Sequence, residues 1–228
     1  MKTELSEKKI SLKTYAITAI LVAVLVFGVT HYIFASSETI TITPQSMVET
    51  ASYTIWKDGS TIHSKNGLTG EVTSGTGAST VIQAALDGLT SERTWKEKVV
   101  IKASLTINTA LTPSDYTIIE ILGKLTYVND AQFSMFDING KSHVDIIGNG
   151  ILDGNRDNVP YHPNNEMIKV RGNSSWITLK DFKIQNHHYE GIVFYDTVDS
   201  IVKNVKGENI TNCLVWVKDN NERISIDG

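Results

Sequence analysis

The 228-residue sequence is poor in cysteine and proline, with one Cys and four Pro. Cys213 has no second cysteine to pair with, so an internal disulfide is excluded, and no surrounding motif predicts a metal ligand. The 21 basic residues form no cluster on one element and are outnumbered by 25 acidic residues. The net charge of −4 argues against nucleic acid as a partner.

Charged residues are also missing from one long stretch near the amino terminus. Residues 15–35 contain no Asp, Glu, Lys or Arg, and a helix of about 20 such residues spans a bilayer. Lys8, Lys9 and Lys13 lie just before the stretch, which predicts that residues 1–14 are cytoplasmic and that 15–35 form a single-pass transmembrane signal anchor. A cleaved signal peptide ending near Ala35 is the alternative.

Both alternatives export the rest of the chain, so we expect it at the cell membrane facing outward, or secreted if the signal is cleaved. Sequons at Asn173 and Asn209 are compatible with that location. Residues 36–50 are polar and predict a linker. Residues 51–75 alternate around two turn dipeptides, Asp58-Gly59 and Asn66-Gly67, and predict a β-hairpin-like leader.

One soluble helix is predicted, over "STVIQAALDGL" at residues 79–89. Thr80 followed by Gln83 fits a capping box, with Thr80 as the N-cap. The apolar residues lie on a single face, namely Val81, Ile82, Ala85, Leu86 and Leu89. We expect this helix to cap the amino-terminal end of the strand-rich region that begins after it.

Short strand-like segments then repeat. "MFDINGKSHVDI", "MIKVRGNSSWIT", "IVFYDTVDSIVK" and "VWVKDNNERISI" share one strand–turn–strand form, and their starts are 32, 25 and 23 residues apart. Such a period without helices predicts an all-β fold, a right-handed single-stranded parallel β-helix (a solenoid) over residues 76–228, with two or three strands per turn. A β-sandwich is the alternative.

Two kinds of column are expected along the solenoid. Ile138, Val170, Phe194 and Val217 occupy equivalent inward positions of the four repeats. Asn155, Asn186 and Asn209 each close a second strand and predict a structural ladder whose amides satisfy turn backbone groups. The alternation still runs in "RISIDG", so we expect the β-helix to be C-terminally incomplete or covered by another chain.

Three segments carry a resemblance to a known family: "GASTVIQAALDGL", "KVVIKASLTINTAL" and "VDIIGNGILDGN". They resemble the amino-terminal part of pectate-lyase-like proteins, the pectin-lyase superfamily of right-handed parallel β-helices, over residues 75–228. The sequence departs from the family at Gly77-Ala78, where an acidic residue is usual, and at Ala103-Ser104, where "P-x-G" is usual. The leader is similar to those of archaeal surface proteins of this class.

This resemblance implies a fold more firmly than an activity. Members include polysaccharide lyases and glycoside hydrolases, and also adhesins and domains without activity. The polygalacturonase signature "N-T-D", "D-D", "G-H-G" and "R-I-K" does not occur in these 228 residues. In that family the signature usually lies several coils after the "I-D-G" strand, so the resemblance leaves open a signature beyond Gly228.

The longest spacing between repeats is due to an insertion, residues 156–166, directly after Asn155. Insertions in solenoids gather on one face, which is often the binding face. The equivalent corner one coil later is "HHYEG", residues 187–191, so both segments are expected on one edge. The catalytic candidates there are Asp157, His187 and Glu190, and the substrate-binding candidates are Arg156, Tyr161, His162, Glu166, His188 and Tyr189.

Carboxylates, imidazoles and aromatic rings together are typical of sites that bind or cleave polysaccharides. An ordinary solvated corner is the alternative, and Asp153, Asp196 and Asp199 are expected to serve the turns. No metal site or cofactor is evident, although Ca²⁺ on acidic side chains stays open. The first hypothesis is a membrane-anchored enzyme, a polysaccharide lyase or glycoside hydrolase; the second is a non-catalytic adhesin, glycan binder or envelope protein. Both take a polysaccharide or cell-surface glycan as partner.

Overall fold

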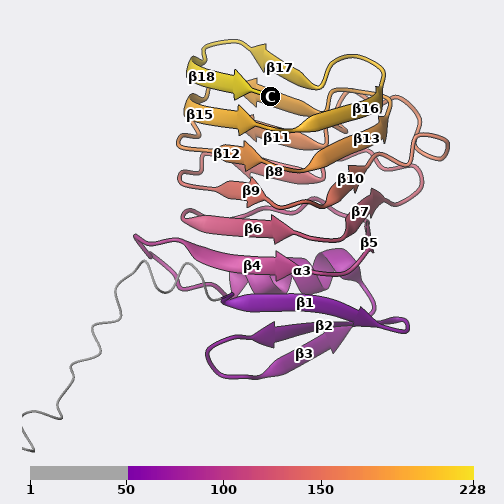
Figure 1. The fold of residues 1–228 in the computed structure, drawn as a ribbon, viewed down its shortest axis with the longest axis vertical. Helices are drawn as coiled ribbons and strands as arrows, with labels where there is room; N and C mark the ends of the chain where they lie inside the picture. The colour runs from indigo at the N-terminus through magenta and orange to yellow at the C-terminus, as the bar shows by residue number, and fades with distance from the viewer. Residues whose placement is uncertain (1–50) are drawn as a thin grey trace, which may run out of the picture. The chain divides into compact units, whose positions relative to one another are not determined.

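A computed structural model describes residues 51–228. Figure 1 shows these residues as a stack of coils, each built from short strands that pair in parallel with the coils above and below. The strands fall into three sheets, so one coil contributes three strands. The predicted all-β parallel β-helix is therefore confirmed.

We name the sheets A, B and C. Sheet A has nine strands: β1 (Tyr53–Asp58), β2 (Thr61–Asn66), β3 (Val72–Gly75), β4 (Glu97–Ile101), β6 (Thr117–Ile121), β9 (Asp145–Ile147), β12 (Thr178–Lys180), β15 (Val198–Lys203) and β18 (Glu222–Asp227). Sheet B has five: β5 (Leu105–Ile107), β7 (Lys124–Tyr127), β10 (Ile151–Asp153), β13 (Lys183–His187) and β16 (Lys206–Ile210). Sheet C has four: β8 (Phe136–Asn139), β11 (Ile168–Arg171), β14 (Ile192–Tyr195) and β17 (Val215–Lys218).

The leader is a three-stranded antiparallel meander, β1–β2–β3. Gly59 turns the chain between β1 and β2 with φ of 57°, in the left-handed region that glycine adopts without strain. β1 also pairs in parallel with β4, so the meander extends sheet A beyond the first coil.

The single described helix, α3 (Ala78–Asp87), packs against β2, β3 and β5. The five apolar residues expected on its inner face are all buried. The prediction of Thr80 as N-cap was wrong, because the helix begins at Ala78 and the cap is Gly77, three residues earlier, with φ of −88°, ψ of 110° and no side-chain hydrogen bond. The Gln83 side chain instead donates from Nε2 to the Thr112 carbonyl at 3.1 Å and accepts at Oε1 from the Thr112 backbone N–H at 3.0 Å. These two bonds tie the helix to the following coil.

The inward column forms as predicted. Val170 pairs with Ile138 on one side and Phe194 on the other, and all three are fully buried. Phe194 pairs in turn with Val217, which is 42% exposed. Parallel strands about 4.8 Å apart thus stack one apolar side chain per coil along the axis.

Each corner of the solenoid is turned by residues with positive φ. One corner uses Asn155, Asn186 and Asn209, with φ of 51°, 52° and 54°. Another uses bulkier residues, among them Tyr116, His143 and Trp176 with φ between 55° and 58°. Such values are uncommon outside glycine, so the repeating coil imposes them at equivalent positions.

The predicted anchor and linker, residues 15–35 and 36–50, lie outside the described residues. Between residues 51 and 228, no helix has the length and apolar character needed to cross a membrane.

Candidate functional site

The asparagine corner lies beneath the predicted site. Asn209 donates its side-chain amide to Asn186 Oδ1 at 3.0 Å, and Asn186 donates in turn to Asp153 Oδ2 at 3.4 Å. Asn155 bonds in the other direction, to the Tyr127 carbonyl and to Asn129 Oδ1, both at 3.0 Å. These amides are used to hold successive coils in register.

Asp153 belongs to the same scaffold. Its carboxylate is 6% exposed and accepts hydrogen bonds from the Asn155 backbone N–H at 2.9 Å and from Gln185 Nε2 at 2.7 Å. Asp145, on the preceding strand β9, forms an ion pair with Lys96 at 2.5 Å. Within residues 51–228, no three His, Cys, Asp or Glu side chains are grouped so that they could hold a metal ion.

The inserted loop, residues 156–166, starts with an arginine that spans two coils. Arg156 Nη1 donates to the His187 carbonyl at 3.2 Å and to the Asn209 carbonyl at 3.3 Å. Asp157 is exposed and lines a small hollow of about 150 Å³ with Arg156 and the corner asparagines. Arg156 therefore serves the scaffold, whereas Asp157 faces solvent.

His187 does not reach this surface, because its side chain is 0% exposed and lies under the loop beside the Tyr127 ring. Neither ring nitrogen has a hydrogen-bond partner among the described residues. Burial lowers the pKa of His187 to about 4, so the ring is neutral at neutral pH. The structure thus separates buried His187 from exposed Asp157, while His162 and His188 are partly exposed.

Two glutamates come together at the base of the loop. Ile168 pairs with Ile192, so Glu166 and Glu190, each two residues earlier, lie on neighbouring coils, and the backbone N–H of Met167 donates to the Glu190 carbonyl at 3.4 Å. Glu166 accepts from Ser134 Oγ at 3.0 Å and forms a 3.1 Å ion pair with Lys169. Glu190 accepts from Asn212 Nδ2 at 2.9 Å. Both side chains are buried, at 1% and 2% exposure.

Two tyrosines lie beside this carboxylate pair. Tyr161 from the loop and Tyr189 from the next coil meet edge to face, with ring centroids 5.1 Å apart and an interplanar angle of 78°. Tyr161 is 58% exposed, so this aromatic pair meets solvent. Burial and the neighbouring Glu190 raise the pKa of Tyr189 to about 12, so its hydroxyl remains a hydrogen-bond donor.

Sequence reasoning missed the adjoining outward surface of sheet C, which we call the sheet C face. It consists of Asp137, Lys169, Arg171, Tyr195, Trp216 and Lys218, on β8, β11, β14 and β17. These residues alternate along the strands with the inward apolar residues, so their outward direction could have been derived from the sequence of the same strands. The apolar period, however, marks only the inward positions.

The sheet C face combines cations with aromatic rings. Lys218 Nζ lies 5.3 Å from the Tyr195 ring centre and 4.9 Å from that of Trp216, within the range of cation–π attraction. Arg171 makes a two-pronged contact with Asp137 at 2.9 and 2.8 Å, which raises the pKa of Arg171. Burial, followed by the charges of Glu166 and Glu190, raises the pKa of Tyr195.

This arrangement can hold a polar ligand that has apolar faces. Ring surfaces offer apolar contact, while lysine, tyrosine and carboxylate groups offer donors and acceptors along successive coils. The groups lie mainly on strands, which hold them more firmly than a loop would.

No protein-family model matches the sequence, and no curated protein matches it. Among solved structures, the chain is similar to a proposed glycosyl hydrolase from Parabacteroides merdae ATCC 43184, with a TM-score of 0.41 and 12% identity. The similarity covers 65% of this chain and 87% of the other.

Proposed function

We propose that the protein binds a polysaccharide along the sheet C face. The observation that carries this proposal is the row of Tyr195, Trp216 and Lys218, which presents ring surfaces and a cation on two neighbouring coils. Sugar rings combine apolar C–H faces with many hydroxyls, and such ligands suit aromatic surfaces flanked by polar groups. A polymer also suits a solenoid, because both extend by repetition.

The proposed setting is the outer side of a membrane, within a protein of the pectate-lyase-like class. The apolar stretch at residues 15–35 and the lysines before it support a signal anchor. The test is protease treatment of intact cells followed by membrane fractionation. Digestion of the β-helix with retention of an amino-terminal membrane fragment is expected; protection of the β-helix in intact cells would refute the orientation.

Binding is tested with the full chain in a non-ionic detergent against a panel of acidic and neutral polysaccharides. Trp216→Ala is expected to weaken binding about tenfold, since loss of one aromatic contact of about 1.4 kcal/mol corresponds to that factor. Leu68→Ala is the matched control, because Leu68 is 95% exposed and lies in the meander. Equal binding by both variants and the wild type would refute the proposal.

Cleavage is the second candidate function, and the Glu166–Glu190 pair favours it. Retaining glycosidases hold two carboxyl groups about 5–5.5 Å apart. Glu166 and Glu190 extend from neighbouring coils, whose strands are about 4.8 Å apart, so their side chains can approach one another. Because the pair is buried, catalysis requires the inserted loop to open and admit the glycosidic bond. Glu190 would then serve as nucleophile or acid, with Glu166 as its counterpart.

Two readouts separate the reaction types. Hydrolysis releases new reducing ends alone, whereas a lyase also generates unsaturated uronates that absorb in the ultraviolet. Glu190→Gln is expected to abolish reducing-end release while leaving binding at the sheet C face intact. Binding without any product across the panel would leave the protein as a glycan binder and refute cleavage.

A further inference from the structure

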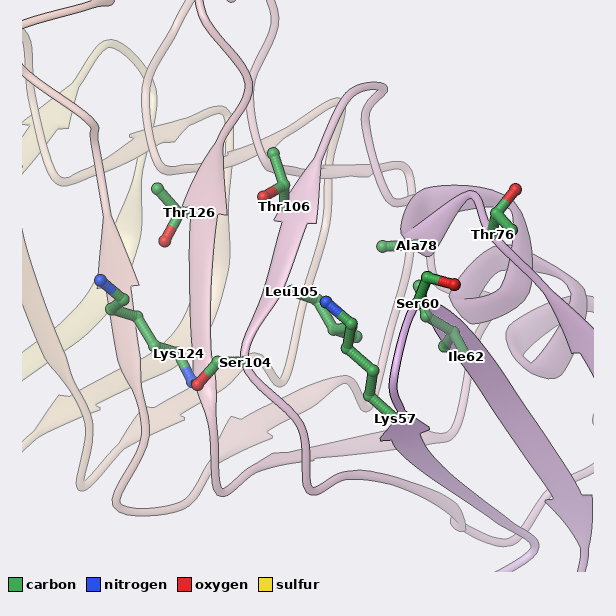
Figure 2. A pocket seen from close by; sticks show the side chains of 10 residues that line it. All are labelled: Lys57, Ser60, Ile62, Thr76, Ala78, Ser104, Leu105, Thr106, Lys124 and Thr126. Atoms are coloured by element: carbon green, nitrogen blue, oxygen red, sulfur yellow. The ribbon is translucent and has the colours of Figure 1, made fainter.

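A second pocket lies far along the sequence from the sheet C face, where the meander and α3 meet the first strands of sheet B (Figure 2). Its volume is about 360 Å³. Its lining consists of Lys57, Ser60, Ile62, Thr76, Ala78, Ser104, Leu105, Thr106, Lys124 and Thr126. None of these residues was a candidate from the sequence, because they come from separate elements between residues 57 and 126.

The charge of the pocket is positive. Two lysines line it and no acidic residue does. Lys57 forms no salt bridge with any described residue, and Lys124 has a single long contact, 3.8 Å, to Asp153. Both lysines are exposed and available to an anion.

Side chains with hydroxyl groups also line the pocket (Figure 2). Thr106 and Thr126 are paired positions on β5 and β7, and their side chains lie on the outer surface of sheet B. Ser60 and Thr76 approach from the β1–β2 turn and from the segment before α3. The first turn of α3 contains no acidic residue, so its amino end adds to the positive potential.

Size and polarity define the ligand class. A water molecule occupies about 30 Å³ of liquid volume, so a bare inorganic anion would leave most of the pocket empty. The volume falls at the lower end of the range for small organic ligands, about 300–1,000 Å³. Ile62, Ala78 and Leu105 supply an apolar patch for the C–H face of a ring, and the hydroxyls supply partners for ring substituents.

We propose that this pocket binds one acidic sugar unit, a pyranose carrying a carboxylate or sulfate that is attracted by the two lysines of the lining. The site is separate from the sheet C face, and the inference does not depend on the function proposed for that face. Ion pairs between exposed groups are screened by salt, so the affinity falls as ionic strength rises.

The test is ligand-observed NMR on the full chain in non-ionic detergent, with four probes: galacturonate, galactose 6-sulfate, galactose and inorganic sulfate. At least one acidic sugar is expected to bind tenfold or more tightly than galactose and than inorganic sulfate. Equal affinity for galactose would refute the role of charge. Equal affinity for inorganic sulfate would refute the sugar-sized site.

The variant test uses Lys57→Met combined with Lys124→Met, which is expected to lower the affinity for the acidic sugar at least tenfold. Lys206→Met is the matched control, because Lys206 is exposed on the same sheet, outside the pocket. Trp216→Ala is expected to leave this affinity unchanged, which separates the pocket from the sheet C face. Wild-type affinity in the double variant, or an equal loss in Lys206→Met, would overturn the proposal. The double variant is compared at a temperature where its circular dichroism matches the wild type. Lys57→Met alone, at an exposed position near the end of β1, provides a second variant.

Discussion

Protonation of His187 links the packing under the inserted loop to a measurable pH dependence. The ring is 0% exposed, and burial lowers the pKa of His187 in the folded protein from 6.5 to about 4. In the unfolded chain the pKa returns to about 6.5. Between these two values the unfolded chain binds more protons, so the free energy of unfolding decreases as the pH falls.

The size of this effect depends on the difference between the two pKa values. At about 1.4 kcal/mol per pH unit, the difference amounts to about 3 kcal/mol. This contribution is fully present above about pH 6.5 and is lost as the pH falls to about 4. It is a large fraction of the stability of an ordinary domain, about 5–15 kcal/mol.

The assay is urea unfolding of the full chain at a series of pH values across this window. His187→Leu removes two ring nitrogens that have no hydrogen-bond partner among the described residues and keeps an apolar side chain. We expect this variant to lose up to about 3 kcal/mol less than the wild type between pH 6.5 and pH 4. His188→Leu is the control, since the neighbouring His188 is partly exposed, and it should follow the wild-type slope. Identical slopes for His187→Leu and the wild type would falsify the assignment of His187 as a buried neutral histidine.

Three further predictions test the packing of the coils by urea unfolding at neutral pH. Phe194→Ala should lower the free energy of unfolding by about 3–5 kcal/mol, because Phe194 is fully buried, whereas Val217→Ala in the same column should cost much less at 42% exposure. Asp153→Ala should cost about 2–4 kcal/mol, since it removes the acceptor for Asn155 and Gln185; a loss below about 0.5 kcal/mol would show that these bonds are not needed. Gly123→Ala should cost about 1–3 kcal/mol, because its Cβ would clash with the Ala103 carbonyl of the preceding coil, and unchanged stability would contradict that close approach.

The fold was predictable because the coil repeats its own sequence pattern. Inward positions such as Val170 and Phe194 recur in phase, and an apolar residue can be buried at that period only if the strands stack. The helix face was predictable for the same reason. The N-cap residue was not predictable, because Thr80 and Gln83 match a local capping motif. The helix instead begins directly after the short connection from β3, with Gly77 as its N-cap.

The site was predictable only in part, because its members approach across coils of unequal length. The sequence placed Glu166, Tyr161, Tyr189 and Glu190 near one edge, and these residues do lie together. It could not show that His187 turns into the core, because strict alternation from Ile184 would point His187 outward, and the positive φ of Asn186, 52°, interrupts that alternation. One residue of difference in phase separates a buried imidazole from an exposed one.

The sheet C face illustrates information that the sequence contained without a local signature. Once Val170, Phe194 and Val217 are assigned inward, the residues between and after them must point outward, and these include Lys169, Tyr195 and Lys218. A period-two strand therefore determines its outer face as soon as its inner face is known. The pocket around Lys57 and Lys124 differs in kind, because it depends on where the meander meets sheet B, which no repeat encodes. Surfaces built within the repeat can thus be derived from sequence, whereas a pocket formed where the repeat begins requires the three-dimensional structure.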